Sequence, residues 1–227
     1  MDLSKIKPNT EKALFLMKRQ LPEFVCDAVN LEGIHYTLPE VQTLLDGITV
    51  GGHKQSDQVV TLNQANAWRF IVKLIENKQF ALTKDIACQI HAIAAKEESL
   101  TWGQFRSGGV MIAGSDYAPP VANQLDHCWD EMLLAANVIT NIYDKAIFIF
   151  LQMARNQFFY DVNKRMGRFM MNGLLLAKGY PAINLPAKKQ LEFNTLMLDF
   201  YRSNDCSAMT AFMKGCLDGR LVEIMSE

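Results

Sequence analysis

The residues best suited to chemistry lie in one short polar stretch, from Gln157 to Arg168. Within eight residues it holds an acid, an amide, three cations and a glycine: Asp161, Asn163, Lys164, Arg165, Arg168 and Gly167. Apolar segments on both sides, residues 146–153 and 169–176, are typical of helices buried in a domain. Because ordering a polar loop between two core helices costs free energy, we expect this loop to hold a ligand.

The side chains of this loop suit a phosphate ligand. The second apolar helix is expected to begin near Met166, which turns its unpaired amides and positive dipole end toward the loop. Arg165 and Arg168 carry guanidinium forks that match phosphate oxygens, and Asp161 is an oxygen ligand of the kind Mg²⁺ prefers. A simpler interpretation is a loop pinned by ion pairs from Asp161 to the arginines, with Lys164 in solvent. Composition alone leaves both interpretations open.

The stretch resembles the signature of the Fic (filamentation induced by cyclic AMP) family, His-Pro-Phe-x-Asp/Glu-Gly-Asn-Gly/Lys-Arg-x-x-Arg. Phe159 takes the place of the phenylalanine and Gly167 falls at a free position, while five polar residues match: Asp161, Asn163, Lys164, Arg165 and Arg168. The resemblance implies an all-α fold, a Fic-type helical bundle with a short β-hairpin flap. It also implies transfer of AMP from Mg·ATP to a hydroxyl side chain of a target protein.

The resemblance also assigns roles, with ATP and Mg²⁺ as the cofactors. Asp161 would bind Mg²⁺, Asn163 would contact the α-phosphate, and the two arginines would hold the outer phosphates. The expected cofactor-binding residues are Asn163, Lys164, Arg165, Gly167 and Arg168. The expected catalytic residues are Asn163, Arg165 and whichever residue occupies the position of the family's histidine.

That position is occupied by Gln157, and Phe158 and Val162 replace the proline and the first glycine of the signature. In the family the histidine takes the proton from the attacking hydroxyl, which a carboxamide cannot do near neutral pH. General-base catalysis is worth roughly 10²–10⁴-fold, so we expect transfer to be impaired. The Cβ of Val162 also penalises any left-handed turn that glycine would allow.

The composition restricts the class of protein. A net charge of −1 with dispersed basic residues argues against nucleic acid or an anionic membrane as the main partner. Five widely spaced cysteines without a CxxC pair favour reduced thiols in a cytoplasmic protein. No secretory signal is visible at the N-terminus and no apolar run reaches the roughly 20 residues of a membrane helix. Secretion without a cleaved signal and homo-oligomer formation are left open.

We expect an N-terminal helical segment over residues 1–60, followed by a Fic-like core over residues 61–227. Predicted helices span residues 11–21, ending before Pro22, and 23–31, ending at Glu32-Gly33. A capping box at Thr37 to Glu40 starts another, and glycines favour a flexible connection over residues 47–60. Many Fic proteins carry an inhibitory helix, Ser/Thr-x-x-x-Glu-Gly/Asn. Glu32-Gly33 resembles its end, although Ala28 stands at the Ser/Thr position, and the resemblance pairs Glu32 with Arg168 as a regulatory contact.

In the core, residues 61–76 and a helix capped by Thr83 have apolar stripes, and His91 is interpreted as a hydrogen-bonded core residue. Residues 108–116 alternate glycine turns with apolar residues, a pattern that predicts a short β-hairpin. By resemblance it is a flap that docks the target protein by strand addition through Gly109, Val110, Met111 and Ile112, with Arg106 before it. An ordinary surface hairpin is the alternative.

Two hypotheses about function follow. The first is a Fic-type protein adenylyltransferase, slow or atypical because of Gln157. The second is a catalytically inactive nucleotide-binding or interaction module that keeps the phosphate site. Gln157 favours the second, whereas Asp161, Asn163 and the arginines fit either. A weaker third option is a reaction that needs no histidine, such as nucleotide hydrolysis.

Overall fold

The computed structural model describes residues 2–227, and these residues form helices and connecting loops without a β-strand. The α-helices are α1 (Thr10–Leu31), α2 (Leu38–Leu45), α3 (Gln55–Glu76), α4 (Lys84–Ala94), α5 (Leu125–Asn137), α6 (Ile142–Asn156), α7 (Asn163–Ala177), α8 (Gln190–Ser203), α9 (Ser207–Lys214) and α10 (Gly219–Ser226). Three single-turn 3₁₀ helices are η1 (Leu3–Lys5), η2 (Ala122–Gln124) and η3 (Ala187–Lys189). The all-α prediction is confirmed for this part of the chain.

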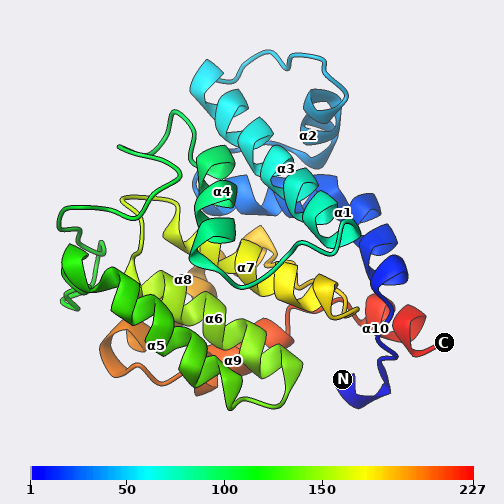
Figure 1. The fold of residues 1–227 in the computed structure, drawn as a ribbon. Helices are drawn as coiled ribbons and strands as arrows, with labels where there is room; N and C mark the ends of the chain where they lie inside the picture. Colours follow the sequence, from blue (N-terminus) through cyan, green and yellow to red (C-terminus); the bar gives the residue numbers. More distant parts are fainter. Residues whose placement is uncertain (1) are drawn as a thin grey trace.

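Helices α6 and α7 form the centre of the bundle, and the polar loop of the sequence analysis joins them (Figure 1). Nearly every residue of α7 is buried, as its apolar sequence predicts. Gly167 lies where α7 crosses α6, and a Cβ there would come within 2.7 Å of the main-chain oxygen of Phe150. Glycine therefore lets the two helices approach closely enough to fix the loop between them.

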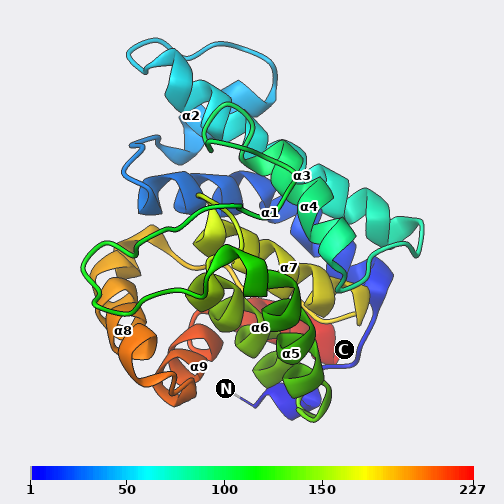
Figure 2. The same ribbon diagram turned by 60° about the vertical axis from the view of Figure 1, so that its left-hand side comes forward.

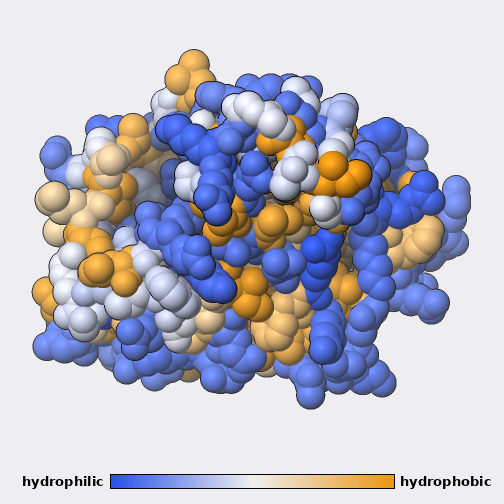
Figure 3. Space-filling view, turned by 90° about the horizontal axis from the view of Figure 1, so that it is seen from above, coloured by the Kyte–Doolittle hydropathy of each residue, from blue (hydrophilic) through white to orange (hydrophobic). Residues whose placement is uncertain are grey.

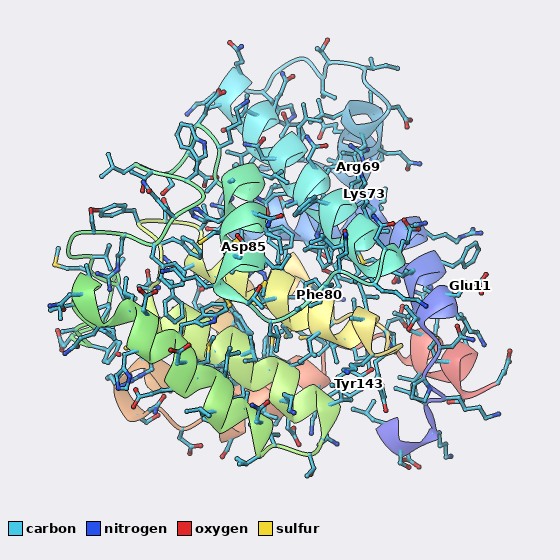
Figure 4. All side chains as sticks on the ribbon, in the orientation of Figure 1. Glu11, Arg69, Lys73, Phe80, Asp85 and Tyr143 are labelled. Atoms are coloured by element: carbon cyan, nitrogen blue, oxygen red, sulfur yellow. The ribbon has the colours of Figure 1, made fainter. Side chains whose placement is uncertain are left out.

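Around this pair, α3 and α4 pack against one side of α7. Helices α8 and α9 lie on the other side of the molecule (Figures 1 and 2). Phe80, from the connection between α3 and α4, lies over α7 (Figure 4), and its ring fills the space that a Cβ on Gly173 would occupy. In the view from above, apolar residues form small groups separated by hydrophilic ones (Figure 3). No helix of residues 2–227 combines the length and the apolar character that crossing a bilayer requires.

Helix α1 is fastened to the bundle at both ends. At its start, Asn9 N donates to the Gly179 oxygen at 2.8 Å, and Gly179 has a φ of +79° directly against Asn9. Nearer its end, the carboxylate of Asp27 accepts from Asn184 Nδ2 at 2.5 Å and from the main-chain N of Ala187 at 2.8 Å. The helix is thereby held against α7 and the segment that follows α7.

Three sequence expectations need correction. Helix α1 does not end before Pro22 but continues through it to Leu31, because buried Met17 and Phe24 hold both halves against the core and outweigh the hydrogen bond that a proline removes. Helix α3 begins at Gln55, inside the expected flexible connection over residues 47–60. The capping box at Thr37 and the end of α1 at Glu32-Gly33 are confirmed.

The third correction concerns the β-hairpin predicted for residues 108–116. This segment forms an extended loop with a turn at which Ser115 N donates to the Ile112 oxygen, and no ladder pairs Val110 to Ile112 with another segment of residues 2–227. Alternating apolar residues indicate a strand only where a partner strand completes their hydrogen bonds, and this loop has none in the described fold.

Candidate functional site

Two residues in left-handed backbone conformation frame the polar loop. Gln157 ends α6 with a φ of +50°, and Val162 precedes α7 with a φ of +64°. For a β-branched residue such as valine this conformation costs free energy, on the order of 1–3 kcal/mol. The loop therefore has a turn at Val162 that glycine would adopt more easily. Burial of the Val162 side chain helps to hold the residue in this strained conformation.

Inside the loop, the side chains of Gln157 and Asn163 hold each other and the main chain. Asn163 Oδ1 accepts from Phe159 N at 2.9 Å, and Asn163 Nδ2 donates to the Phe159 oxygen at 2.8 Å and to Gln157 Oε1 at 3.0 Å. Gln157 Nε2 in turn donates to the Ala154 oxygen at 2.6 Å. Both amides are thus used to shape the loop, and Gln157 offers no atom that could accept a proton near neutral pH.

The N-terminus of α7 faces this loop and has no side-chain cap. A helix start whose first amides lack such a partner attracts anions through its N–H groups and dipole. Asp161 lies next to it with an exposed side chain, and its Oδ1 accepts from Val162 N at 2.6 Å. No group of three metal-binding side chains forms in residues 2–227. A single exposed carboxylate beside an anion site nevertheless fits Mg²⁺, which protein sites bind through one or two carboxylates together with phosphates and water.

Two buried arginines lie along the first turns of α7, and each approaches an acid. Arg165 is 3% exposed and Arg168 is 7% exposed. Glu98 pairs with both terminal nitrogens of Arg165, from Nη1 to Oε2 at 2.9 Å and from Nη2 to Oε1. Glu32 Oε1 lies 3.8 Å from Arg168 Nη2, the residue with which the sequence analysis paired it, and 3.7 Å from Arg165 Nε, a contact that the sequence analysis did not anticipate.

The two guanidinium groups differ in how well they are satisfied. Burial lowers the pKa of Arg168 to about 10, although Glu32 acts in the opposite direction. Its Nη1 and Nη2 have no hydrogen-bond partner among the described residues, and neither has Arg165 Nε. Burial also lowers the pKa of Arg165, but Glu98, Glu32 and Asp161 outweigh it and raise the pKa overall. Arg168 is thus a buried guanidinium whose two terminal nitrogens have hydrogen-bond capacity that no described residue uses.

A small cavity of about 20 Å³ lies behind Arg168 and is lined by Ala28, Gln64, Arg165 and Arg168 among others. Gln64 Oε1 is buried there without a hydrogen-bond partner in the described fold. The volume is on the order of one water molecule. Ala28, where the resemblance described in the sequence analysis led us to expect serine or threonine, thus lies beside these unsatisfied polar atoms.

Changing Ala28→Ser should therefore stabilise the protein by about 0.5 kcal/mol, because a new hydroxyl bond in the cavity exceeds the lower helix propensity of serine. A rise of roughly 1–2 °C in the melting temperature is the expected result. Ala13→Ser is the matched control, since Ala13 is buried on the same helix but packs in the apolar core, and it should lower the melting temperature. Equal responses of the two variants would contradict this account of the cavity.

His91 is buried and packs against the polar loop. Its ring stacks on Phe159 with centroids 3.8 Å apart, its Nδ1 accepts from Gly103 N at 3.1 Å, and its Nε2 lies 3.4 Å from the Asp161 oxygen. Burial lowers its pKa to about 4. The interpretation of His91 as a hydrogen-bonded core residue is confirmed, and both ring nitrogens are engaged.

Arg106 joins the polar loop to the extended segment that precedes α5. Its buried guanidinium donates to the main-chain oxygens of Gln157 at 2.6 Å, Gly108 at 2.6 Å and Pro120, and its main-chain N donates to the Phe158 oxygen at 2.9 Å. Both ends of the segment 108–120 are thereby fixed beside the loop. Within that segment, Gly109 and Met111 are exposed, and Val110 and Ile112 are half-buried.

The structure thus brings together most of the residues that the sequence singled out. Asp161, Asn163, Lys164, Arg165, Arg168 and Glu32 surround the start of α7. Gly167 lies instead in the contact with α6, where its role is close helix packing. The sequence analysis missed Glu98, which follows α4 in an unremarkable run of charged residues, Lys96-Glu97-Glu98. No local pattern could identify it, because its contact with Arg165 depends on how α4 packs against α7.

Comparison with known proteins finds a family that matches part of this chain. Residues 81–175 match the model of the Fic/DOC family, and they include Glu98, Arg106 and the whole polar loop. Proteins named protein adenylyltransferase Fic from Drosophila mojavensis and Drosophila erecta are 22% identical over 204 residues, or 88% of this chain. The chain spans only about 40% of the length of these relatives.

Solved structures share the fold. A Fic domain-containing signalling protein from Bacteroides thetaiotaomicron superimposes with a TM-score of 0.78 at 18% identity, covering 98% of this chain and 91% of the other. Residues 134–508 of Fic-1 from C. elegans give a TM-score of 0.78 at 15% identity, covering 92% of this chain and 62% of the other. The helical arrangement around α6 and α7 is therefore that of Fic domains.

Proposed function

We propose, on the premise that residues 81–175 of this chain are a Fic/DOC-family region, that the site at the start of α7 binds ATP and transfers AMP slowly to a hydroxyl side chain of a target protein. Pyrophosphate leaves as the new phosphoester bond forms, and the hydroxyl proton passes to solvent, because Gln157 cannot accept it. The observation that carries the proposal is the buried guanidinium of Arg168, whose terminal nitrogens lack a hydrogen-bond partner beside an uncapped helix N-terminus. The curated relatives are named as adenylyltransferases, which supports ATP as the nucleotide.

In this proposal each residue of the site has a separate role in nucleotide binding. The first amides of α7 and the guanidinium groups of Arg165 and Arg168 would bind phosphate oxygens. Asp161 would hold Mg²⁺, which when bound neutralises charge on the phosphates. Asn163 shapes the loop through Phe159, as the structure has it, and so sets the position of the amides. Glu32 would oppose binding, because its carboxylate lies between both guanidinium groups.

The second candidate is a nucleotide-binding module without transfer activity. It is favoured by Gln157, whose amide is bonded at both ends, to Asn163 and to Ala154, and which cannot act as a base. Under either hypothesis the target protein would dock on the segment 109–112, where exposed Met111 and the open Gly109 leave the main chain accessible to an extended peptide. Under both hypotheses we propose that the protein is located in the cytoplasm.

Purified protein incubated with Mg²⁺ and ATP labelled at the α-phosphate distinguishes the two candidates. Adenylyl transfer predicts slow labelling of the protein or of an added target, and loss of the label in Arg165→Ala. The module predicts Mg²⁺-dependent binding in calorimetry without label. Arg69→Ala, an exposed arginine on α3 (Figure 4), is the matched control and should change neither result. Absence of both binding and label, also after Glu32→Gly, would refute a nucleotide site.

A further inference from the structure

A second carboxylate occupies the phosphate site proposed above. Glu98 lies in the turn after α4, and its two oxygens contact Arg165 Nη1 and Nη2 in a side-by-side pair. The side chain of Arg165 is 3% exposed and that of Glu98 is 21% exposed, so the pair is largely shielded from solvent. Its charge-assisted bonds are accordingly strong compared with those of a surface ion pair.

The turn that carries Glu98 is fixed by neighbouring side chains. Asn63 Nδ2, from α3, donates to the Lys96 oxygen at 2.8 Å. Within the turn, Glu98 N donates to the Ala95 oxygen at 3.1 Å, and Glu97 has a φ of +64°. A turn held in this way presents Glu98 to Arg165 in a defined position, which is what a specific contact requires.

The pair changes what Arg165 can offer to a ligand. A carboxylate on the two terminal nitrogens of an arginine takes the same positions as two oxygens of a phosphate. With Glu98 in place, only Nε of Arg165 lacks a hydrogen-bond partner in the described fold, and Nε faces Glu32 at 3.7 Å. The two guanidinium charges on α7 are thus balanced by two carboxylates from separate elements, the end of α1 and the turn after α4.

We propose that Glu98 is a second acidic latch, which competes with polyphosphate for Arg165, so that full binding of the nucleotide requires displacement of Glu98 as well as Glu32. The inference rests on the proposed function, because it concerns the same site. An alternative role predicts the opposite sign: if Glu98 orients Arg165 for the ligand, removing its charge weakens binding.

Calorimetric titration with Mg·ATP of the wild type, Glu98→Gln, Glu32→Gln and the double variant measures that sign. Glutamine keeps one oxygen to accept from Arg165 but removes the charge and replaces the second acceptor with an NH₂ group. We expect each single variant to bind on the order of tenfold more tightly, the equivalent of about 1.4 kcal/mol, and the double variant to bind more tightly than either. Glu97→Gln is the matched control: it removes the same charge one residue away, where the side chain faces Lys96, and it should bind as the wild type does.

Each outcome of the titration has one meaning. If Glu32→Gln binds nucleotide and Glu98→Gln leaves the affinity unchanged or lowers it in both backgrounds, the latch is refuted while the proposed function stands. If no variant binds nucleotide, including the double variant, the proposed function fails and the latch with it. Should Glu98→Gln fail to fold by circular dichroism, Glu98→Asp replaces it: the side chain is shorter by one methylene, so its carboxylate no longer reaches Arg165 as Glu98 does, and tighter binding is again expected.

Discussion

Replacing Gln157 by histidine in a chain that also carries Glu32→Gly should raise self-labelling with ATP by roughly 10²–10⁴-fold. The reason is that everything around position 157 is kept except a group able to accept a proton. Gln157 has the left-handed backbone at the end of α6, it contacts Asn163, and it lies in the loop that leads to the arginines. Removing the charge of Glu32 frees Arg168 at the same time. Labelling with α-phosphate-labelled ATP, followed by gel autoradiography, measures the gain.

The matched control for this experiment is Gln157→Asn with Glu32→Gly, which changes the side chain at position 157 without introducing a base and should give no gain in labelling. Adding Arg165→Ala to the histidine variant should abolish the gain, since the phosphates lose one of their two guanidinium groups. A histidine variant that binds ATP in calorimetry but labels no faster would contradict a Fic-type arrangement of the loop. It would favour the inactive nucleotide-binding module.

The largest expected effect on stability belongs to Arg106→Ala. The guanidinium of Arg106 is buried and donates to main-chain oxygens of Gln157, Gly108 and Pro120. Hydrogen bonds from a charged donor contribute about 1.5–3 kcal/mol each, and the alanine variant leaves several buried oxygens unpaired. Because such contributions are not additive, we expect a loss of about 3–5 kcal/mol and a melting temperature lower by roughly 10 °C.

Two variants give this prediction its controls. Arg106→Lys keeps the charge but loses the planar fork that reaches several oxygens, and it should fall between the wild type and the alanine variant. Arg69→Ala removes an exposed arginine of α3 and should change stability by no more than about 0.5 kcal/mol. Thermal unfolding followed by circular dichroism measures all three. Equal melting of Arg106→Ala and the wild type would show that Arg106 does not fasten the segment 108–120 to the loop.

The sequence was sufficient to predict those elements whose determining interactions are local. The caps at Thr37 and Thr83, the end of α1 at Gly33 and the helices on both sides of the polar loop follow from spacing and residue type, and the structure has them. The sequence analysis expected the Cβ of Val162 to penalise a left-handed turn, and the structure has Val162 in that conformation, with a φ of +64°.

The sequence was insufficient to predict local structure or contacts that depend on segments distant in the chain. Pro22 did not end α1, because packing of both halves of that helix decides its continuity. The alternating residues at 110–112 did not form a hairpin, because a strand needs a partner that local sequence cannot supply. Glu98 remained unnoticed for the same reason. In the sequence it is one acid among 24 Asp and Glu residues, and only the fold brings it into contact with Arg165, which lies 67 residues further along the chain.

The attachment of α1 at both ends determines how the site could open. A helix of 22 residues is about 33 Å long, and here its first turn is bonded to Gly179 while Asp27 near its end is bonded to Asn184 and Ala187. Sliding or tilting α1 would break these bonds together, at a cost greater than that of rotating one side chain. Glu32 lies just beyond the last bonded turn, so its carboxylate can swing away from Arg168 about its own side-chain torsions while the helix stays in place. Access to Arg168 would then depend on rotation of the Glu32 side chain, which is fast compared with domain motion, and not on displacement of the N-terminal helix.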